Sequence, residues 1–84
     1  MTYFVYILQS EKDGSYYIGH TGNLEERLNR HNEGRSQYTK GKLPVKLIYQ
    51  EVFNSKAGAM KREREMKEKK DRGYIENLVR TSRP

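Results

Sequence analysis

A tyrosine-rich hairpin near the N-terminus constrains the fold most strongly. Bulky residues alternate over residues 3–8 and again over residues 16–19, with the turn-forming pair Asp13-Gly14 between them. Alternation with a period of two is typical of strands, and an Asp-Gly pair favours a tight hairpin turn. The chain is therefore expected to begin with two antiparallel strands.

The register of this hairpin decides which side chains share a face. A loop centred on Asp13-Gly14 pairs residues whose numbers sum to 27, so even positions of the first strand lie beside odd positions of the second. Tyr6 and Tyr17 then emerge on the same face. Gly19 leaves open space beside them, where a ligand or a backbone can approach.

Local signals mark three helices and a third strand after the hairpin. Asn23 followed by Glu26 is a capping-box pattern, and Ser55 is a second N-cap. Gly34 and Gly73 stand where helices end. The expected elements are a helix over 24–33, a strand over 45–53, a long helix over 56–72, a short helix over 74–80 and a frayed end over 81–84.

The resulting order, β-β-α-β-α-α, predicts an α+β fold in which helices flank a three-stranded antiparallel sheet. A chain of 84 residues has room for one small domain, spanning residues 1–84. The apolar stretch at residues 3–8 is too short to span a bilayer or to act as a secretory signal core, so we expect a cytoplasmic protein with no membrane partner.

Composition limits the chemistry. The chain has no cysteine, which excludes disulfides and thiolate metal sites, and its two histidines match no common zinc spacing. Glycine-rich phosphate loops are also missing from the sequence. Seventeen basic against eleven acidic residues give a net charge of +6, which suits a polyanion such as nucleic acid. Many small basic domains, however, are merely soluble.

Two tyrosines and an arginine are candidates for catalysis. Tyr6 and Tyr17 can be packing residues, because strands favour tyrosine for its ring. A tyrosine base needs nearby positive charge, since an unperturbed phenol with a pKa of about 10 is only about 0.1% ionised at neutral pH. Arg27 is placed to supply that charge. It can also bind a phosphate, or cap the apolar stripe of its helix and pair with a glutamate.

His31 and Glu63 are the other candidates. His31 follows Arg27 by one helical turn, so it can contact a phosphate or transfer a proton, or be a surface histidine near a helix C-terminus. Glu63 falls among the inward-facing apolar positions of the long helix. A magnesium ion and Lys67, one turn further on, are both possible partners for its carboxylate.

Taken together, the motifs resemble those of the GIY-YIG endonucleases. The matching segments cover nearly the whole chain: Phe4-Val5-Tyr6, Tyr17-Ile18-Gly19, His20 to Leu24 leading to Arg27, His31 to Gly34, Tyr38-Thr39, Pro44 to Tyr49, and Ala59 through Glu63 to Lys67. The chain is similar to small stand-alone members related to the nuclease domains of an excision-repair subunit and of intron homing endonucleases.

The resemblance implies a role for each candidate. Tyr6 would be the general base or water-orienting phenol and Tyr17 its partner. Arg27 would clamp the phosphate, with His31 as a secondary contact. Glu63 would hold Mg²⁺, or Mn²⁺ in its place, and the reaction would be hydrolysis of a DNA phosphodiester. Phe4 departs from the first signature glycine, and Asn77 is the one asparagine near the position of a late polar residue found in many members.

Three functional hypotheses follow. The first is a metal-dependent endonuclease acting in DNA repair or on structured DNA, with RNA as another possible substrate and a protein partner as a possible source of specificity. The second is a non-catalytic nucleic-acid-binding module of the same fold, in which basic residues of the long helix, Lys61, Arg64 and Lys67, matter more than Tyr6. The third is a protein-interaction domain with weak, salt-sensitive affinity for nucleic acid.

Overall fold

The computed structural model describes residues 1–82 and has the predicted α+β architecture. The elements are strands β1 (Tyr3–Ser10), β2 (Tyr16–Thr21) and β3 (Val45–Phe53), helices α1 (Leu24–Asn32), α2 (Lys56–Glu68) and α3 (Arg72–Thr81), and a short 3-10 turn η1 (Lys40–Lys42). Both neighbours of β1 run antiparallel to it, in the order β2-β1-β3. Residues 83 and 84, part of the expected frayed end, lie outside the described residues.

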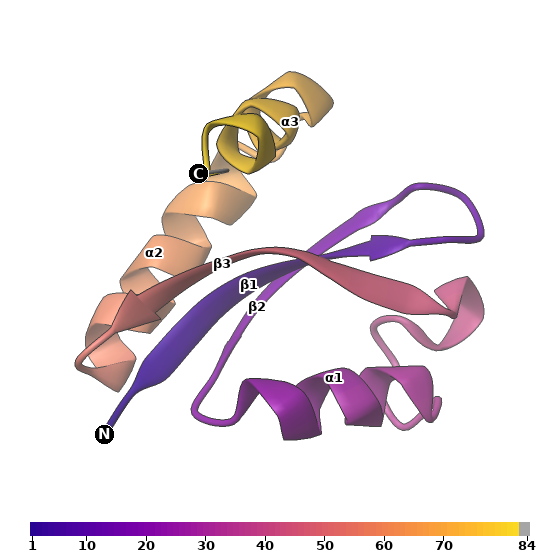
Figure 1. Cartoon of the computed structure of the whole chain (residues 1–84), viewed down its shortest axis with the longest axis horizontal. Helices are drawn as coiled ribbons and strands as arrows, with labels where there is room; N and C mark the ends of the chain where they lie inside the picture. The colour runs from indigo at the N-terminus through magenta and orange to yellow at the C-terminus, as the bar shows by residue number, and fades with distance from the viewer. Residues whose placement is uncertain (83–84) are drawn as a thin grey trace.

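The sheet separates two layers of helices. α1 packs on one face, whereas α2 and α3 cover the other (Figure 1). The apolar cluster beneath α2 and α3 is formed by Val5, Ile7, Ile18, Ala59, Met66 and Ile75. The cluster that faces α1 is formed by Tyr6, Leu8, Tyr17 and Val45. Odd and even positions of β1 therefore serve different cores, as the strand period requires.

The hairpin confirms the predicted faces but not the predicted pairing. Tyr6 lies opposite Gly19 and Leu8 opposite Tyr17, so the numbers of paired residues sum to 25 and not to 27. The turn is closed by a hydrogen bond from the Ser10 backbone N–H to the Ser15 carbonyl, and Gly14 takes the left-handed position with φ 79°. Because the slip is two residues, each side chain stays on its predicted face.

The boundary between the last two helices differs from the prediction. α2 ends at Glu68, four residues before the expected Arg72. Asp71 begins α3 as its N-cap, because its carboxylate accepts a hydrogen bond from the Tyr74 backbone N–H at 2.9 Å. Gly73 therefore lies within the first turn of α3 and does not separate the helices.

The other predicted helix-capping residues are confirmed. The Asn23 side chain accepts from the Glu26 backbone N–H, and the Ser55 hydroxyl accepts from the Gly58 N–H, both at 3.1 Å. Gly34 has φ 77° just beyond the end of α1. Within residues 1–82, no helix has the length and apolar character needed to cross a membrane.

An ion pair joins α2 to the far edge of the sheet. The Arg62 guanidinium donates two hydrogen bonds of 2.9 Å to the two carboxylate oxygens of Glu51 on β3. The Tyr49 hydroxyl donates to the same carboxylate. Burial and this contact raise the pKa of Tyr49 to about 12. The bidentate geometry fixes the position of α2 on the sheet.

Candidate active site

The hollow that carries the candidate chemistry lies at the edge of the sheet formed by β2. Residues of both α1 and α2 line it. These two helices lie on opposite sides of the sheet (Figure 1). The lining residues of the hollow are Tyr6, Ile18, Gly19, His20, Arg27, His31, Ser36, Tyr38, Glu63 and Lys67. Side chains that point to opposite faces of the sheet thus meet around its edge.

Gly19 makes room for Tyr6 at this edge. A Cβ atom at residue 19 would lie 2.5 Å from the Tyr6 hydroxyl oxygen and 2.7 Å from its Cζ. Real side chains do not tolerate such contacts, so the phenol reaches the hollow across a residue without a side chain. The Tyr6 ring itself is buried, with 4% of its surface exposed.

A buried histidine contacts the Tyr6 hydroxyl from α1. Nε2 of His31 lies 3.4 Å from that oxygen, and Nδ1 lies 2.7 Å from the Thr39 hydroxyl. His31 is 3% exposed and Thr39 is fully buried. The surface histidine that was one of the two sequence alternatives is therefore wrong: His31 belongs to an internal chain of polar groups that ends at Tyr6.

Burial keeps both groups of this pair neutral. It raises the pKa of the Tyr6 hydroxyl above its usual value, and the nearby Arg27 guanidinium, which acts to lower that pKa, does not offset it. Arg27 thus supplies the positive charge that the sequence placed near Tyr6, but burial outweighs its effect on the phenol pKa. Burial and the charges of Arg27 and Arg30 lower the pKa of His31. At neutral pH the pair is a phenol beside an uncharged imidazole.

Glu63 reaches the hollow from α2 with both of its oxygens engaged. His20 Nδ1 lies 2.6 Å from Oε1, and Lys67 Nζ lies 3.0 Å from Oε2. A carboxylate has no proton to give, so the imidazole donates. Burial acts to raise the pKa of Glu63, but the hydrogen bonds from His20 and Lys67 outweigh it and hold that pKa below its ordinary value. Glu63 is therefore an anion at neutral pH.

Aromatic rings and lysines extend the site along the surface. The rings of Tyr17 and Tyr38 meet edge to face, with centroids 4.7 Å apart. Lys67 Nζ lies 5.8 Å from the centroid of Tyr38, and Lys70 Nζ lies 5.5 Å from that of Tyr17. Tyr38 is 49% exposed although it is a large aromatic residue. Exposed rings beside ammonium groups suit nucleobases and phosphates.

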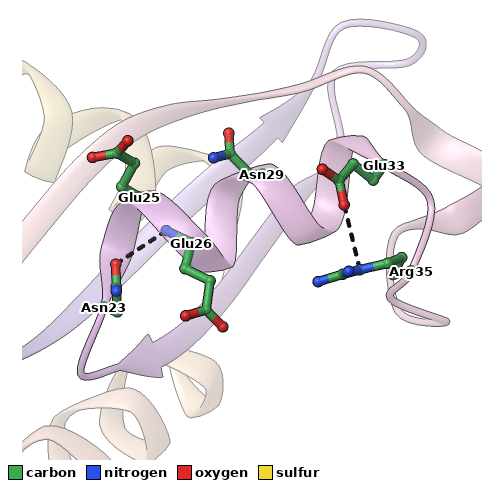
Figure 2. Close-up of a pocket in the computed structure, with 6 residues that line it drawn as sticks. All are labelled: Asn23, Glu25, Glu26, Asn29, Glu33 and Arg35. Atoms are coloured by element: carbon green, nitrogen blue, oxygen red, sulfur yellow. Dashed lines mark hydrogen bonds and ion pairs between the residues drawn. The ribbon is translucent and has the colours of Figure 1, made fainter.

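A second hollow on the outer side of α1 has the opposite charge. It is lined by Asn23, Glu25, Glu26, Asn29, Glu33 and Arg35 (Figure 2). Some of its polar groups already have partners within the chain: Asn23 caps the first turn of α1, and Glu33 pairs with Arg35 at 3.4 Å (Figure 2). Three carboxylates on this side repel a polyanion, so the protein presents a basic edge at β2 and α2 and an acidic one beyond α1.

Comparison with protein families identifies the chain. Residues 2–75 match the model of the GIY-YIG catalytic domain. The chain belongs to the GIY-YIG family. Relatives include a UPF0213 protein of Staphylococcus haemolyticus, 50% identical over 77% of this chain and 79% of that protein, and one of Bacillus licheniformis, 43% identical over 94% of this chain and 84% of that protein.

A solved structure has the same GIY-YIG fold. The solution NMR structure of a UPF0213 protein from Bacillus halodurans superimposes with a TM-score of 0.60 at 38% sequence identity, covering 96% of this chain and 85% of that one. The resemblance inferred from the sequence motifs and the predicted fold are both confirmed.

The GIY-YIG fold brings most of the predicted site residues together. Tyr6, Arg27, His31, Glu63 and Lys67 all line the hollow beside Gly19.

The other predicted residues lie around or away from it. Tyr17 borders the hollow through Tyr38, and Arg64 lines a neighbouring depression with His20, Glu63 and Lys67. Lys61 is exposed on α2. Asn77 does not reach this hollow: it lies exposed on α3, where its side chain accepts a hydrogen bond from Arg80.

Sequence reasoning missed His20 and the roles of Tyr38 and Thr39. His20 was considered only as a zinc ligand. Strand alternation puts it on the face opposite Tyr17 and Gly19, toward α2, where Glu63 was expected to point inward, so the two patterns together could have found this contact. Tyr38 lies within a polar loop, and an aromatic residue in such a loop could have indicated an exposed contact residue. Thr39 had no signal, because its role depends on the burial of His31.

Proposed function

We propose that the chain is a metal-dependent endonuclease that hydrolyses phosphodiester bonds of DNA. The observation that carries the proposal is the convergence of Tyr6, Arg27 and Glu63, from three different elements, on one hollow. A phenol can orient water, a guanidinium can bind a phosphate, and a carboxylate can hold a divalent cation. The basic, aromatic surface beside the hollow favours a nucleic acid as the substrate.

A divalent cation fits the donors in the hollow. Nowhere in residues 1–82 do three or more His, Cys, Asp or Glu side chains gather in a metal-binding cluster. Glu63 is the carboxylate that lines the hollow, with His20 on one of its oxygens and Lys67 on the other. Mg²⁺ commonly binds to one or two carboxylates and fills its remaining positions with water and phosphate oxygens. We assign Glu63 as the ligand of Mg²⁺, or of Mn²⁺ in its place, which when bound would stabilise charge on the departing oxygen.

The other residues of the hollow bind the phosphate and orient the attacking water. Arg27 binds the phosphate oxygens, on which negative charge grows as the phosphorus is attacked. Tyr6, a neutral phenol, orients the attacking water, and His31 can exchange a proton with that phenol through Nε2. Water forms the new phosphorus–oxygen bond as the bond to the 3′ oxygen breaks. No covalent enzyme intermediate is involved.

The biological setting is a further part of the proposal. Membership of the GIY-YIG family, together with the resemblance to an excision-repair nuclease domain, favours branched or flapped DNA as the substrate and a role in repair. RNA has the same phosphodiester chemistry and is a second substrate to test. We expect the protein to act in the cytoplasm, with specificity supplied by DNA shape or by a protein partner.

A nicking experiment tests the proposal. Supercoiled plasmid and branched or flapped DNA are incubated with Mg²⁺ or Mn²⁺ and either the wild type or the folded variants Glu63→Gln and Tyr6→Phe. Glu65→Gln and Tyr3→Phe are matched controls, because both residues lie outside the hollow. Glu65 is half exposed on the same helix as Glu63, and Tyr3 packs against the apolar cluster beneath α2 and α3. Metal-dependent cleavage that is lost in the first pair and retained in the second supports the proposal. Equal cleavage by all five proteins contradicts it.

A non-catalytic nucleic-acid-binding module is the second candidate. It is favoured by the neutral Tyr6 phenol and by the engagement of both Glu63 oxygens within the protein. This function predicts binding of all these DNAs with no metal-dependent cleavage, and it predicts that Glu63→Gln binds DNA at least as well as the wild type does.

A further inference from the structure

The two oxygens of Glu63 are held by two very different groups. His20, on Oε1, comes from a strand of the sheet, and 25% of its side chain is exposed. Lys67, on Oε2, lies one turn further along the same helix, and 47% of its side chain is exposed. The imidazole of His20 is held close to the backbone of a strand by a short side chain, whereas the ammonium of Lys67 lies at the end of a long, flexible side chain and can move. Lys67 is therefore the partner that can leave.

The Lys67 ammonium also has a second possible position within the hollow. It already lies over the exposed ring of Tyr38, and both residues line the hollow with Arg27. Rotation of the side chain away from Glu63 and into the hollow leaves the ammonium near this ring, in the same hollow as the Arg27 guanidinium. Two cations placed in this way suit a phosphate group.

We propose that Lys67 is a built-in counter-ion of Glu63, which a divalent cation replaces and which then binds a phosphate of the nucleic acid. The inference rests on the proposed function, since it concerns the same carboxylate. A lysine ammonium and a divalent cation compete for the same oxygen, because together they would bring three positive charges to one site. His20 stays in place on Oε1 and keeps the carboxylate pointing into the hollow.

This exchange makes two binding events depend on each other. A cation that displaces Lys67 frees an ammonium for the phosphate. A phosphate that attracts Lys67 leaves Oε2 open for the cation. By linkage, each ligand must then strengthen the binding of the other by the same factor, typically about 5-fold or more for coupled sites. Without metal, the ion pair keeps the carboxylate neutralised and stops it from repelling the DNA backbone.

The first experiment measures Mn²⁺ affinity directly, from the electron paramagnetic resonance signal of the free ion. Lys67→Met removes the ammonium but keeps most of the aliphatic side chain. We expect it to bind Mn²⁺ about 5-fold more tightly than the wild type does. Lys69→Met is the matched control, because it removes the same charge from an exposed position at the end of α2 and leaves Glu63 paired. An affinity of Lys67→Met equal to or weaker than that of Lys69→Met would overturn the inference.

The second experiment measures the coupling. In a Tyr6→Phe background, which prevents cleavage, a short DNA duplex should increase Mn²⁺ affinity several-fold. The increase should shrink when Lys67→Met is added. An undiminished increase in the double variant counts against the exchange.

The outcomes separate this inference from the proposed function. Mn²⁺ binding that Glu63→Gln abolishes, with no gain in Lys67→Met, rejects the lysine exchange and retains the metal site. Mn²⁺ binding that is absent from the wild type and from Lys67→Met alike rejects both.

Discussion

The hydroxyl of Tyr6 occupies the space that a side chain at Gly19 would fill, with 2.5 Å between the phenol oxygen and the missing Cβ position. Gly19→Ala should therefore push the phenol out of the hollow. We expect the free energy of unfolding to fall by about 1–3 kcal/mol, as in other overpacked sites, and cleavage per folded molecule to drop sharply. Urea unfolding and plasmid nicking measure the two effects.

Gly41→Ala is the control for that change. Apart from Gly41 and its two chain neighbours, no atom lies within 4 Å of the corresponding Cβ position. Its effect on stability should stay within about 0.5 kcal/mol. If Gly19→Ala behaves like Gly41→Ala, the close contact with Tyr6 has no energetic importance.

The buried His31 predicts a pH dependence of stability. Its pKa in the folded protein lies below the ordinary value of 6.5, so below that pH the unfolded chain binds the proton more readily. The free energy of unfolding should thus fall as the pH drops from 6.5 toward the folded pKa, by up to about 1 kcal/mol at pH 5.5. Above pH 6.5 the slope from this histidine fades, and it is nearly zero by about pH 7.5. Urea unfolding at pH 7.5, 6.5 and 5.5 measures the effect.

His31→Gln should flatten this slope. The variant is less stable at pH 7.5, but its stability should change little between pH 7.5 and pH 5.5. Proton NMR of the wild-type imidazole provides an independent check, and a titration midpoint at or above 6.5 would contradict the prediction.

The ion pair of Glu51 and Arg62 should stabilise the fold without taking part in cleavage. Glu51→Gln leaves a partly buried guanidinium without its charged partner, so we expect a loss of about 1–2 kcal/mol. A double-mutant cycle with Arg62→Met measures the coupling energy. Neither residue lines the hollow, so nicking by folded protein should be unchanged. Loss of activity in step with that of Glu63→Gln would show that the pair also positions the site.

Basic residues of α2 should determine the salt dependence of DNA binding. Reversing Lys61 and Arg64 to Glu removes up to two phosphate contacts, so the slope of log K against log [salt] should become less steep by about 1–2. Fluorescence anisotropy over a salt series measures this slope. Lys46→Glu is the matched control, because Lys46 lies exposed on β3, at the opposite edge of the sheet from β2. An equal change in all variants would indicate a non-specific effect of net charge.

Local patterns were sufficient to predict much of the fold. The strand faces of the hairpin were correct although its pairing was two residues off, because a two-residue slip preserves the side-chain period. The caps at Asn23 and Ser55 were correct because each depends on a single contact within one helical turn.

The predictions were wrong or incomplete where the outcome depends on competing interactions or on residues distant in the sequence. Asp71 was assigned to the last turn of the long helix, but its side chain accepts a hydrogen bond from the Tyr74 backbone N–H and begins the next helix. The balance between burial and Arg27 at the Tyr6 hydroxyl is also a matter of tertiary structure, since the sequence reveals the neighbouring charge but not the depth of the phenol. The same holds for His20, whose partner lies 43 residues away along the chain.

The division of the core into two clusters has a consequence for the folding chain. Tyr6, His31 and Arg27 depend on the layer that holds α1, and Glu63 depends on the layer that holds α2. A molecule in which either helical layer has detached from the sheet retains only part of this set of residues. Partly folded copies, such as those emerging during synthesis, therefore lack the complete set of groups that the proposed cleavage needs.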